Sequence, residues 1–369
     1  MKIIGPKAYI HTDRLKKNLW NIRRHVGDRK LICVVKANGY GHGSLNIVNS
    51  IKDEPGISFA VFSFEEAFAL RKEKIQNDIL IFSRIQDYHF QKAIDLDLII
   101  TVSTVDDQKR VIEFYRENNT YPRFHLNFDT GMTRLGMALE DGNQIFNLIN
   151  RENEFMPEGI YSHFATADEG DLSFAEIQLN RFKQVVQQGL DLGINFKSIH
   201  FSNSGTILNI PDALFNAVRV GILMYGVAPS DEVPMDIDVE PVMSFCAPIV
   251  YVRFVKAGTP ISYGGIYITE NNTNIGVVQC GFADGFPRPW FEKGYVSYNG
   301  KNYKIAGRAC MDQLMVDFGD TIPKEGDEVL FFGKKDGNDI RVETIAQAID
   351  TTTYVLLTDI HGRTERIKI

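Results

Sequence analysis

Short apolar runs alternate with longer amphipathic runs through the first part of the chain. The amphipathic runs show the helical period of apolar positions, for example in Phe64–Lys74, Val105–Asn118 and Phe174–Leu192. Eight further runs have the length and apolar character of strands: Leu31–Val35, Ser58–Phe62, Ile79–Phe82, Leu98–Val102, Arg123–Asn127, Gly159–His163, Ser198–Phe201 and Ala217–Val220. Strands that alternate with helices predict a parallel sheet. Eight such units predict an α/β fold with an N-terminal (β/α)8 TIM barrel over residues 1–232.

The segment Phe64–Lys74 also carries a helix start signal. Ser63 stands just before it and Glu66 follows three residues later, which is the spacing of a capping box. The last turn of the segment is basic, as the negative end of a helix dipole favours. We therefore expect a helix that begins at Phe64.

The pattern changes after Pro229, where Ser230–Asp238 has the composition of a linker. Strand-like runs separated by Gly and Asn turns follow, namely Ala247–Val255, Asn274–Gln279, Tyr295–Asn299 and Glu328–Phe332. Only Val342–Ile349 is clearly helical. These features predict a mostly β C-terminal domain over residues 233–369, and the extreme N-terminus is a candidate to pair with it.

Composition narrows the class of protein. Hydrophobic residues make up 44% and charged residues 24% of the 369 residues, which is typical of a soluble globular protein. The net charge of −7 argues against nucleic acid or an anionic membrane as a partner. The four cysteines lie far apart, without metal-ligand or redox spacing, and no apolar stretch has the length of a signal peptide or membrane helix. We expect a cytoplasmic protein with reduced thiols and no metal site.

Lys36 is the first candidate for chemistry. It lies in the glycine-rich run Val34–Gly43, at the end of the first predicted strand. Burial beside apolar residues disfavours an ammonium ion and lowers the pKa of a lysine, so that more of the neutral amine is present. A neutral amine attacks carbonyl groups and forms Schiff bases. For Lys36 alone, a lysine that merely reaches from a strand end to solvent is the competing and more common explanation.

Polar side chains gather where other predicted strands end, which is the active-site face of a (β/α)8 barrel. Asn127 ends the fifth strand and His163 the sixth. Asn203 and Ser204 follow the seventh strand, and Arg219 lies near the end of the eighth. Their common position indicates one site rather than separate structural roles.

A barrel lysine that forms a Schiff base indicates pyridoxal 5'-phosphate, whose phosphate group needs hydrogen-bond donors. Ser204 begins a helix-like run, and Gly221 and Ile222 offer backbone N–H groups after the eighth strand. The alternatives for single residues are a helix cap for Ser204 and a hydrogen-bonded core histidine for His163.

Arg219 bears on the type of reaction, because an arginine cannot take up a proton. Beside the pyridine nitrogen it would leave that nitrogen unprotonated and weaken the electron sink, which suppresses transamination. His200 is placed on the neighbouring strand to support it.

Racemisation also needs a base on each face of the α-carbon. Lys36 supplies one and Tyr263 is the candidate for the other, with Arg134 as the cation that would lower its pKa; a turn tyrosine is the competing explanation.

The segments that hold these residues resemble the bacterial alanine racemases, which are fold-type III pyridoxal phosphate enzymes. The resemblance covers essentially the whole chain, in Val34–Gly43, Phe128–Gly136, Gly159–Asp168, Asn203–Ser204, Val218–Arg219, Tyr225–Gly226, Ser262–Gly264, Ala283–Gly285, Gly307–Gln313 and Tyr354. It implies an isomerase that interconverts L-alanine and D-alanine by a two-base mechanism and supplies D-alanine for peptidoglycan.

The resemblance also implies a role for each matching residue. Lys36 would carry the cofactor as an internal aldimine and act on D-alanine, whereas Tyr263 would act on L-alanine. Arg134 and the backbone N–H of Met311 would bind the substrate carboxylate. The cofactor contacts would be Lys36, Tyr40, Arg134, His163, Asn203, Ser204, Arg219, Gly221, Ile222 and Tyr354. The supporting residues would be His200, Asp312 and Asn127. The enzyme would be a head-to-tail homodimer in which Tyr263 and Met311 reach across the interface.

The chain departs from the family pattern at Asn127, where many members carry a carbamylated lysine. Asparagine cannot be carbamylated, and we expect its amide to donate instead to an anion such as chloride beside Arg134. Phe282 stands where a tyrosine is usual, and Thr352 and Val355 replace the usual residues around the family's tyrosine. The polar entrance would be lined by Asp168, Arg288 and Arg308.

Two alternatives remain open at the level of sequence. One is a broad-specificity or serine racemase of the same fold, although the bulky phenol of Tyr354 favours alanine. The other is a non-catalytic pyridoxal phosphate-binding protein, but such chains usually lack a β domain and hence Tyr263. A decarboxylase of the same fold is disfavoured, because we expect an acid near its ring nitrogen where this chain has Arg219.

Overall fold

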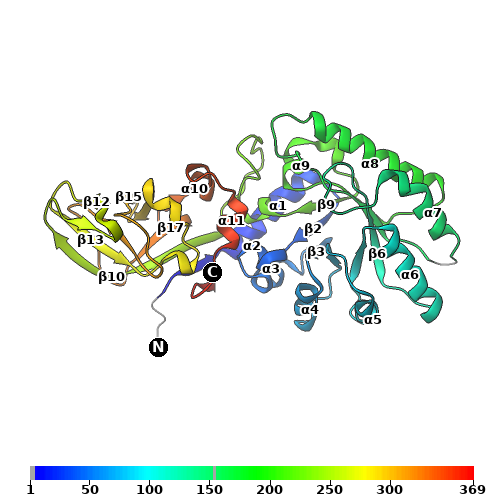
Figure 1. The fold of residues 1–369 in the computed structure, drawn as a ribbon, viewed down its shortest axis with the longest axis horizontal. Coiled ribbons are helices and arrows are strands. Elements are labelled where there is room, and N and C mark those ends of the chain that lie inside the picture. Colours follow the sequence, from blue (N-terminus) through cyan, green and yellow to red (C-terminus); the bar gives the residue numbers. More distant parts are fainter. Residues whose placement is uncertain (1–4, 153–154) are drawn as a thin grey trace.

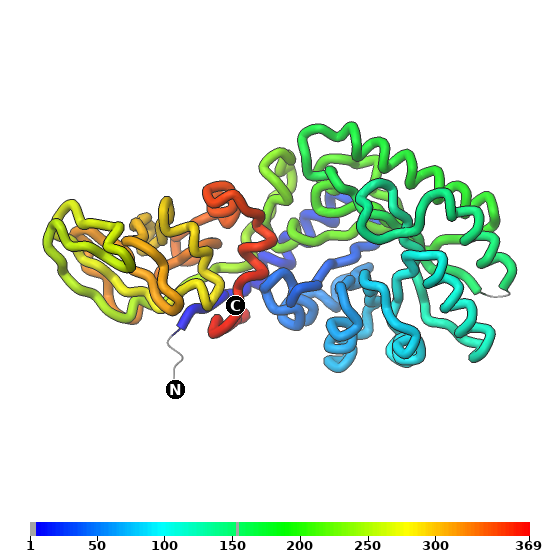
Figure 2. Tube along the Cα trace, viewed as in Figure 1, coloured from blue at the N-terminus to red at the C-terminus, as the bar shows by residue number. Residues whose placement is uncertain are grey.

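The computed structural model describes residues 5–152 and 155–369, and two lobes follow one another along the longest axis of the molecule (Figure 1). The larger lobe contains strands surrounded by helices, and the smaller lobe is built mostly of strands. The first strand, β1 (Lys7–Ile10), and the last, β19 (Glu365–Lys368), lie at the junction of the two lobes (Figure 2).

The larger lobe is a nearly closed barrel of eight parallel strands, which confirms the predicted fold class. The strands follow one another in the order β8-β7-β6-β5-β4-β3-β2-β9, and each is parallel to its neighbours. They are β2 (Lys30–Val34), β3 (Ile57–Val61), β4 (Ile79–Ile81), β5 (Ile99–Val102), β6 (Arg123–Asn127), β7 (Gly159–Tyr161), β8 (Ser198–His200) and β9 (Ala217–Val220). Nearly every strand residue is buried, because one face points into the barrel and the other lies under helices.

Helices cover the outside of the barrel (Figure 1). They are α1 (Thr12–Val26), α3 (Ser44–Ile51), α4 (Phe64–Lys72), α5 (Phe90–Asp95), α6 (Val105–Asn118), α7 (Gly142–Asn150), α8 (Ser173–Asp191) and α9 (Ser204–Asn209). The amphipathic pattern explains their packing, since Leu15, Leu19 and Ile22 of α1 recur at helical spacing and are all buried. Helix α4 begins at Phe64, as predicted from its capping box.

The second lobe is organised around the long strand β10 (Met243–Val255). Its first half is buried throughout, and it pairs antiparallel with β1, β13 (Thr273–Val278) and β17 (Glu328–Lys335). Strand β1 is also parallel to β19, so the first strand of the chain belongs to the sheet of the second lobe. The other elements here are β11 (Pro260–Ile261), β12 (Tyr267–Ile268), β14 (Tyr295–Tyr298), β15 (Lys301–Lys304), β16 (Leu314–Asp317), β18 (Asn338–Ile340), α10 (Val342–Ala348) and α11 (Thr353–Thr358).

Two details differ from the sequence-based prediction. The sequence predicts that His163 ends a strand, but β7 ends at Tyr161 and His163 lies in the loop beyond it. Helix α10 is also not alone in the second lobe, because α11 follows it. Thr352 caps α11 by accepting the N–H of Val355 at 3.5 Å, whereas the β-branched threonines around it have low helix propensity and hide the helix in the sequence.

Candidate active site

The backbone after Lys36 is wound in the left-handed sense. Lys36 begins α2 (Lys36–Tyr40), and the φ angles of Ala37, Asn38, Gly39 and Tyr40 are 51°, 53°, 63° and 51°. For residues with a side chain this conformation costs roughly 1–2 kcal/mol each. A loop of this shape therefore needs strong contacts on all sides to persist.

Contacts from several elements supply that support. The Oε1 atom of Glu66 accepts the N–H of Ala37 at 2.7 Å, and Asn38 Oδ1 accepts the N–H of Ser44 at 3.1 Å. His42 is fully buried, and its Nδ1 donates towards the carbonyl of Tyr40 at 2.9 Å. Contacts within the protein, made by these side chains, thus fix the loop after Lys36.

The C-terminal segment holds the same loop from the other side. Arg366 of β19 donates from Nε to the carbonyl of Gly41 at 2.6 Å. Gly41 has a φ of 81°, and a Cβ on it would overlap the carbonyl oxygen of Leu357 in α11. Only glycine permits this close approach. The second lobe therefore shapes the barrel loop that carries Lys36.

Lys36 lies half-buried among cations. Burial lowers the pKa of its amine, the charges of Arg134 and Arg219 lower it further, and Glu66 opposes them. Within the described ranges, Lys36 Nζ forms no hydrogen bond or ion pair. The environment thus favours a neutral, nucleophilic amine, as expected from the sequence.

Arg219 is the most deeply buried charge of the site, with 3% of its surface exposed. Its Nη1 donates to His200 Nδ1 at 2.7 Å, and its Nη2 donates to the carbonyl of Ser162 at 2.8 Å and to His163 Nδ1 at 3.1 Å. None of its hydrogen-bond partners in the described chain is a carboxylate, and burial lowers its pKa to about 10. Arg219 Nε has no hydrogen-bond partner in this part of the chain.

Arg219 fixes the protonation of the histidines around it. An arginine only donates, so the neutral rings of His163 and His200 accept at Nδ1 and carry their proton on Nε2. Burial, followed by the charge of Arg219, keeps the pKa of both rings well below the usual value. His200 Nε2 then donates to His125 Nδ1 at 2.9 Å. Arg219 thus determines which group donates and which accepts in each hydrogen bond of the series Arg219–His200–His125.

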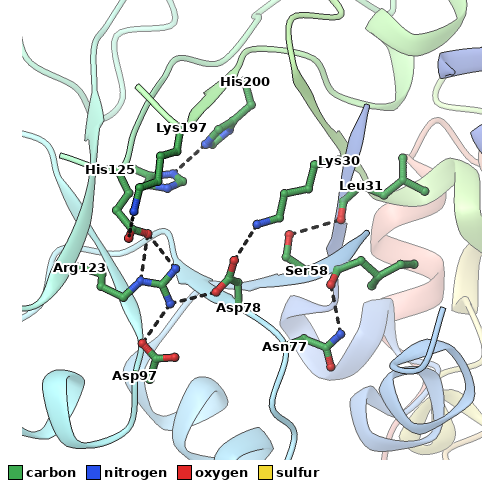
Figure 3. A network of polar contacts seen from close by, with 12 residues as sticks. Lys30, Leu31, Ser58, Asn77, Asp78, Asp97, Arg123, His125, Lys197 and His200 are labelled. Atoms are coloured by element: carbon green, nitrogen blue, oxygen red, sulfur yellow. Dashed lines mark hydrogen bonds and ion pairs between the residues drawn. The ribbon is translucent and has the colours of Figure 1, made fainter. Parts of the chain in front are cut away.

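A network of charges lies next to His125, at the ends of the barrel strands opposite the site (Figure 3). Arg123 pairs with Asp78 at 2.9 Å and with Asp97 at 3.0 Å, and Lys30 pairs with Asp78 at 2.6 Å. Burial raises the pKa of Asp78, but Lys30 and Arg123 outweigh it and hold the pKa at about 2. Residues at this face of a barrel serve stability rather than catalysis.

Hydroxyl groups surround Gly221 at the start of the loop after β9. Ser204 Oγ accepts the N–H of Gly221 at 3.1 Å and that of Leu223 at 3.3 Å, so its own hydrogen remains free to donate. A Cβ on Gly221 would lie 2.9 Å from the hydroxyl oxygen of Tyr40. The rings of Tyr40 and Tyr354 lie 5.9 Å apart, and burial raises the pKa of both, so both hydroxyls keep their protons.

Two further predicted residues have clear local roles. Asn203 is the N-cap of α9, because its Oδ1 accepts the N–H of Thr206 at 2.9 Å. Ile222 is the first residue of a short 3-10 helix, Ile222–Tyr225, where a backbone N–H has no acceptor within the helix. In sequence, Asn203 directly precedes Ser204 and Ile222 directly follows Gly221.

Asn127 holds the loop that carries Arg134. Its Nδ2 donates to Ser103 Oγ and to the carbonyl of Leu135, each at 3.2 Å. Both amide hydrogens thus have acceptors in the protein, which leaves none for the anion that the sequence suggests. Arg134 itself is exposed, yet it lies close enough to lower the pKa of Lys36 and of His163.

Tyr263 and Met311 lie on loops of the second lobe and not among the described residues that contact Lys36. Tyr263 begins a 3-10 turn between β11 and β12, at the end of the second lobe remote from α2 (Figure 1). Tyr263 is 67% exposed and Met311 57% exposed. Their loops are joined, because Ser262 Oγ donates to the carbonyl of Arg308 at 2.6 Å. The structure therefore forms two separate clusters of predicted site residues, not one.

Residues near the expected entrance have partners of their own. Asp312 pairs with Arg363 at 2.9 Å, so its expected support of Tyr263 stays a prediction. Arg288 lies over the ring of Phe282, with 5.8 Å between the guanidinium carbon and the ring centre. Burial raises the pKa of Asp168.

Sequence reasoning missed three contributors to the site. Glu66 looks like a helix cap, His42 belongs to the same run as Lys36 but has no obvious role, and His125 lies inside a strand. The contact between Glu66 and Ala37 spans 29 positions, and no periodicity reveals it. For His125 the sequence does hold a signal, because a polar residue two positions before Asn127 on the same predicted strand points to the same face as Asn127.

In residues 5–152 and 155–369, no three His, Cys, Asp or Glu side chains gather where they would hold a metal ion. No helix in these ranges has the length and apolar character needed to cross a membrane.

Comparison with known proteins agrees with the observed fold. The family model for the N-terminal domain of alanine racemase matches residues 10–229, and that for the C-terminal domain matches residues 242–368. The chain is 35% identical to an alanine racemase of Desulforamulus reducens over 366 residues, which cover 98% of each chain. It is also similar to the structure of alanine racemase from Streptomyces coelicolor, with a TM-score of 0.93, 32% identity and coverage of 100% and 98%. A structure from Bartonella henselae, described with covalently bound pyridoxal phosphate, has a TM-score of 0.88, 26% identity and full coverage of both chains. The chain belongs to the alanine racemase family.

Proposed function

We propose that this chain interconverts L-alanine and D-alanine with pyridoxal phosphate attached to Lys36, and that it supplies D-alanine for peptidoglycan. The observation that carries the proposal is the position of Lys36 at the barrel rim together with Arg219. Lys36 has a lowered pKa, and Arg219 is buried without a carboxylate partner among the described residues.

The residues around Lys36 fit pyridoxal phosphate. An amine with a lowered pKa suits condensation with an aldehyde. Protonated hydroxyls of Tyr40 and Ser204 around a glycine at position 221 suit a phosphate group. Arg219 uses both terminal nitrogens on protein acceptors, so its Nε suits a ring nitrogen that stays unprotonated. We expect the N–H of Ile222 and the hydroxyl of Tyr354 to complete the phosphate site, with His163 and Asn203 near the ring.

Bound there, the cofactor would withdraw electrons from the substrate's bond to the α-proton. Lys36 Nζ removes this proton from D-alanine, and the hydroxyl of Tyr263 delivers one on the opposite face. In the reverse direction the two residues exchange roles. Arg134 and the N–H of Met311 hold the substrate carboxylate, which keeps the α-carbon between the two bases.

We propose a homodimer, because no described contact of Lys36 involves Tyr263 or Met311, which lie on loops of the second lobe. Their exposure supports the idea that they enter the site of a second copy. We place the boundary between the two domains at residues 232 and 233, which lies between the two family matches. A cytoplasmic location stays a prediction.

A racemase assay tests the proposal. Pure protein with added pyridoxal phosphate is incubated with L-alanine, and D-alanine is measured over time; L-serine and other small L-amino acids serve as a panel. We expect rapid formation of D-alanine and slower turnover of serine, because Tyr354 leaves little room for a hydroxymethyl group. Turnover of serine without alanine would favour the serine racemase, and cofactor binding without any turnover would favour the non-catalytic protein.

A further inference from the structure

Glu66 joins two neighbouring loops at the rim of the barrel. Its Oε1 accepts the N–H of Ala37, directly after Lys36, at 2.7 Å. Its Oε2 accepts the N–H groups of Phe62 at 2.8 Å and Ser63 at 3.3 Å, in the loop after β3. A capping box accounts for the contact with Ser63 but not for the contact with Ala37.

Only a carboxylate satisfies this arrangement. Three N–H groups approach the side chain of Glu66 from two directions, and both of its oxygens accept. A glutamine offers one oxygen and one NH2 group, so the NH2 group would face either Ala37 or Phe62, donor against donor. Position 66 therefore demands more than a helix cap, because glutamine serves a capping box well.

The contact acts at the point where the chain turns left-handed. Ala37 is the first residue of the left-handed run, and its φ of 51° is costly for a residue with a side chain. A hydrogen bond at the N–H of Ala37 fixes the peptide plane between Lys36 and Ala37. The Cα atom of Lys36 lies in that peptide plane and carries the lysine side chain. Fixing the plane therefore also fixes the direction in which the side chain of Lys36 leaves the backbone.

Charge reinforces the geometry. The groups around Lys36 are Arg134 after β6, His163 after β7, Arg219 of β9 and Glu66 of α4. Both arginines lower the pKa of Lys36, whereas Glu66 raises it, and His163 is neutral. Under the proposed function, Tyr263 of a second copy joins them.

We propose that Glu66 is a positioning residue for Lys36, which fixes the peptide after the lysine and so directs its amine at the α-carbon of D-alanine. The inference rests on the proposed function, because it gives Lys36 its role as the base for D-alanine. It predicts that damage at position 66 affects one direction of proton removal more than the other.

Glu66→Gln tests the inference, with two matched controls. Glu65→Gln removes the neighbouring acidic charge from the first turn of α4, and Ser63→Ala removes the other half of the capping box. Exchange of the α-proton in heavy water is measured separately from D-alanine and from L-alanine. We expect Glu66→Gln to slow exchange from D-alanine about tenfold more than exchange from L-alanine. Loss of the charge should also move the acid limb of kcat for D-alanine to lower pH.

A second measurement does not depend on turnover. The cofactor-free chain is mixed with pyridoxal phosphate, samples are reduced with borohydride, and modified Lys36 is quantified by mass spectrometry. We expect uptake by Glu66→Gln to be about tenfold slower, with both controls within about twofold of the wild type. Urea unfolding curves of Glu66→Gln, Glu65→Gln and Ser63→Ala serve to check that each variant is folded.

The outcomes separate the inference from the proposed function. Equal exchange from both enantiomers together with normal uptake by Glu66→Gln would overturn the inference. So would an equal loss in Ser63→Ala, which would assign the effect to the helix cap. If the wild type itself takes up the cofactor but exchanges neither enantiomer, the proposed function fails, and uptake alone then decides whether Glu66 positions Lys36.

Discussion

The protonation of single side chains is set by burial in this protein, most clearly around Arg219. None of the hydrogen-bond partners of this guanidinium group among the described residues is a carboxylate, and the two neighbouring imidazole rings accept its hydrogens while uncharged. His200 and His125 are therefore locked as neutral rings with a defined proton position. Burial holds the pKa of His125 at about 3 and that of His42 at about 4. These values make the folded state sensitive to acid.

The free energy of unfolding should rise with pH between about 4 and 6.5. Below 6.5 the unfolded chain protonates His11, His42, His125, His163 and His200 more readily than the folded chain does, so the unfolded state binds more protons. Five such groups give a slope of up to about 7 kcal/mol per pH unit. Urea titrations at a series of pH values measure it. His125→Asn should reduce the slope by about 1.4 kcal/mol per unit, whereas His361→Asn, at an exposed position, should not. Constant stability across this range would contradict the assignment.

At the level of elements, the loop after β2 depends on helix α11 of the other lobe. Gly41 lies against the backbone of Leu357, and Arg366 donates to the carbonyl of Gly41. The same helix carries Tyr354, so the contact that shapes the lysine loop also positions a predicted phosphate ligand.

Gly41→Ala should therefore separate α11 from the barrel. We expect a loss of about 3 kcal/mol or more in the free energy of unfolding, because the new methyl group meets backbone that cannot yield. Gly193→Ala is the matched control. Its φ of 82° equals that of Gly41 within a degree, but no atom lies within 4 Å of the added Cβ, so we expect only about 1 kcal/mol. Only Gly41→Ala should also bind pyridoxal phosphate more weakly. Equal losses in the free energy of unfolding for Gly41→Ala and Gly193→Ala would refute the packing argument.

Much of this arrangement was predictable from the sequence, for physical reasons that differ between residues. Apolar period and helix caps are local, so the eight barrel strands and the start of α4 at Phe64 follow from the pattern. The position of Lys36 follows because parallel strands end at one face. The contact between Glu66 and Ala37 does not follow, because it depends on how two loops lie in space. Nor does the free exposure of Tyr263, which no spacing in the chain indicates.

At the scale of the whole molecule, the proposed function makes the site of one chain incomplete, because Tyr263 and Met311 lie outside the cluster around Lys36. Tyr263 begins the turn between β11 and β12, at the end of the second lobe remote from α2 (Figure 1), and Met311 is an exposed residue of the same lobe. If two copies meet head to tail, each site takes its lysine from one chain and its tyrosine from the other. Such an exchange is symmetric, and closes into a dimer.

Co-expression of two inactive variants tests this arrangement. Lys36→Ala and Tyr263→Ala should each reduce racemase activity by at least about a hundredfold. Mixed dimers, however, contain one site with both Lys36 and Tyr263 intact. Since half of randomly formed dimers are mixed and one of their two sites is complete, we expect roughly a quarter of the wild-type activity. Recovery near zero, with mixed dimers present by mass spectrometry, would place both bases in the same chain.

The pairing of β1 with β10 and β19 has a consequence for biosynthesis. A chain leaves the ribosome from its N-terminus, so β1 emerges long before the strands that flank it. The barrel segments are complete well before residues 365–368 appear, yet Arg366 is needed to hold Gly41 beside α11. The loop after Lys36 can therefore reach its final shape only after residues 365–368 have been made and have paired with β1.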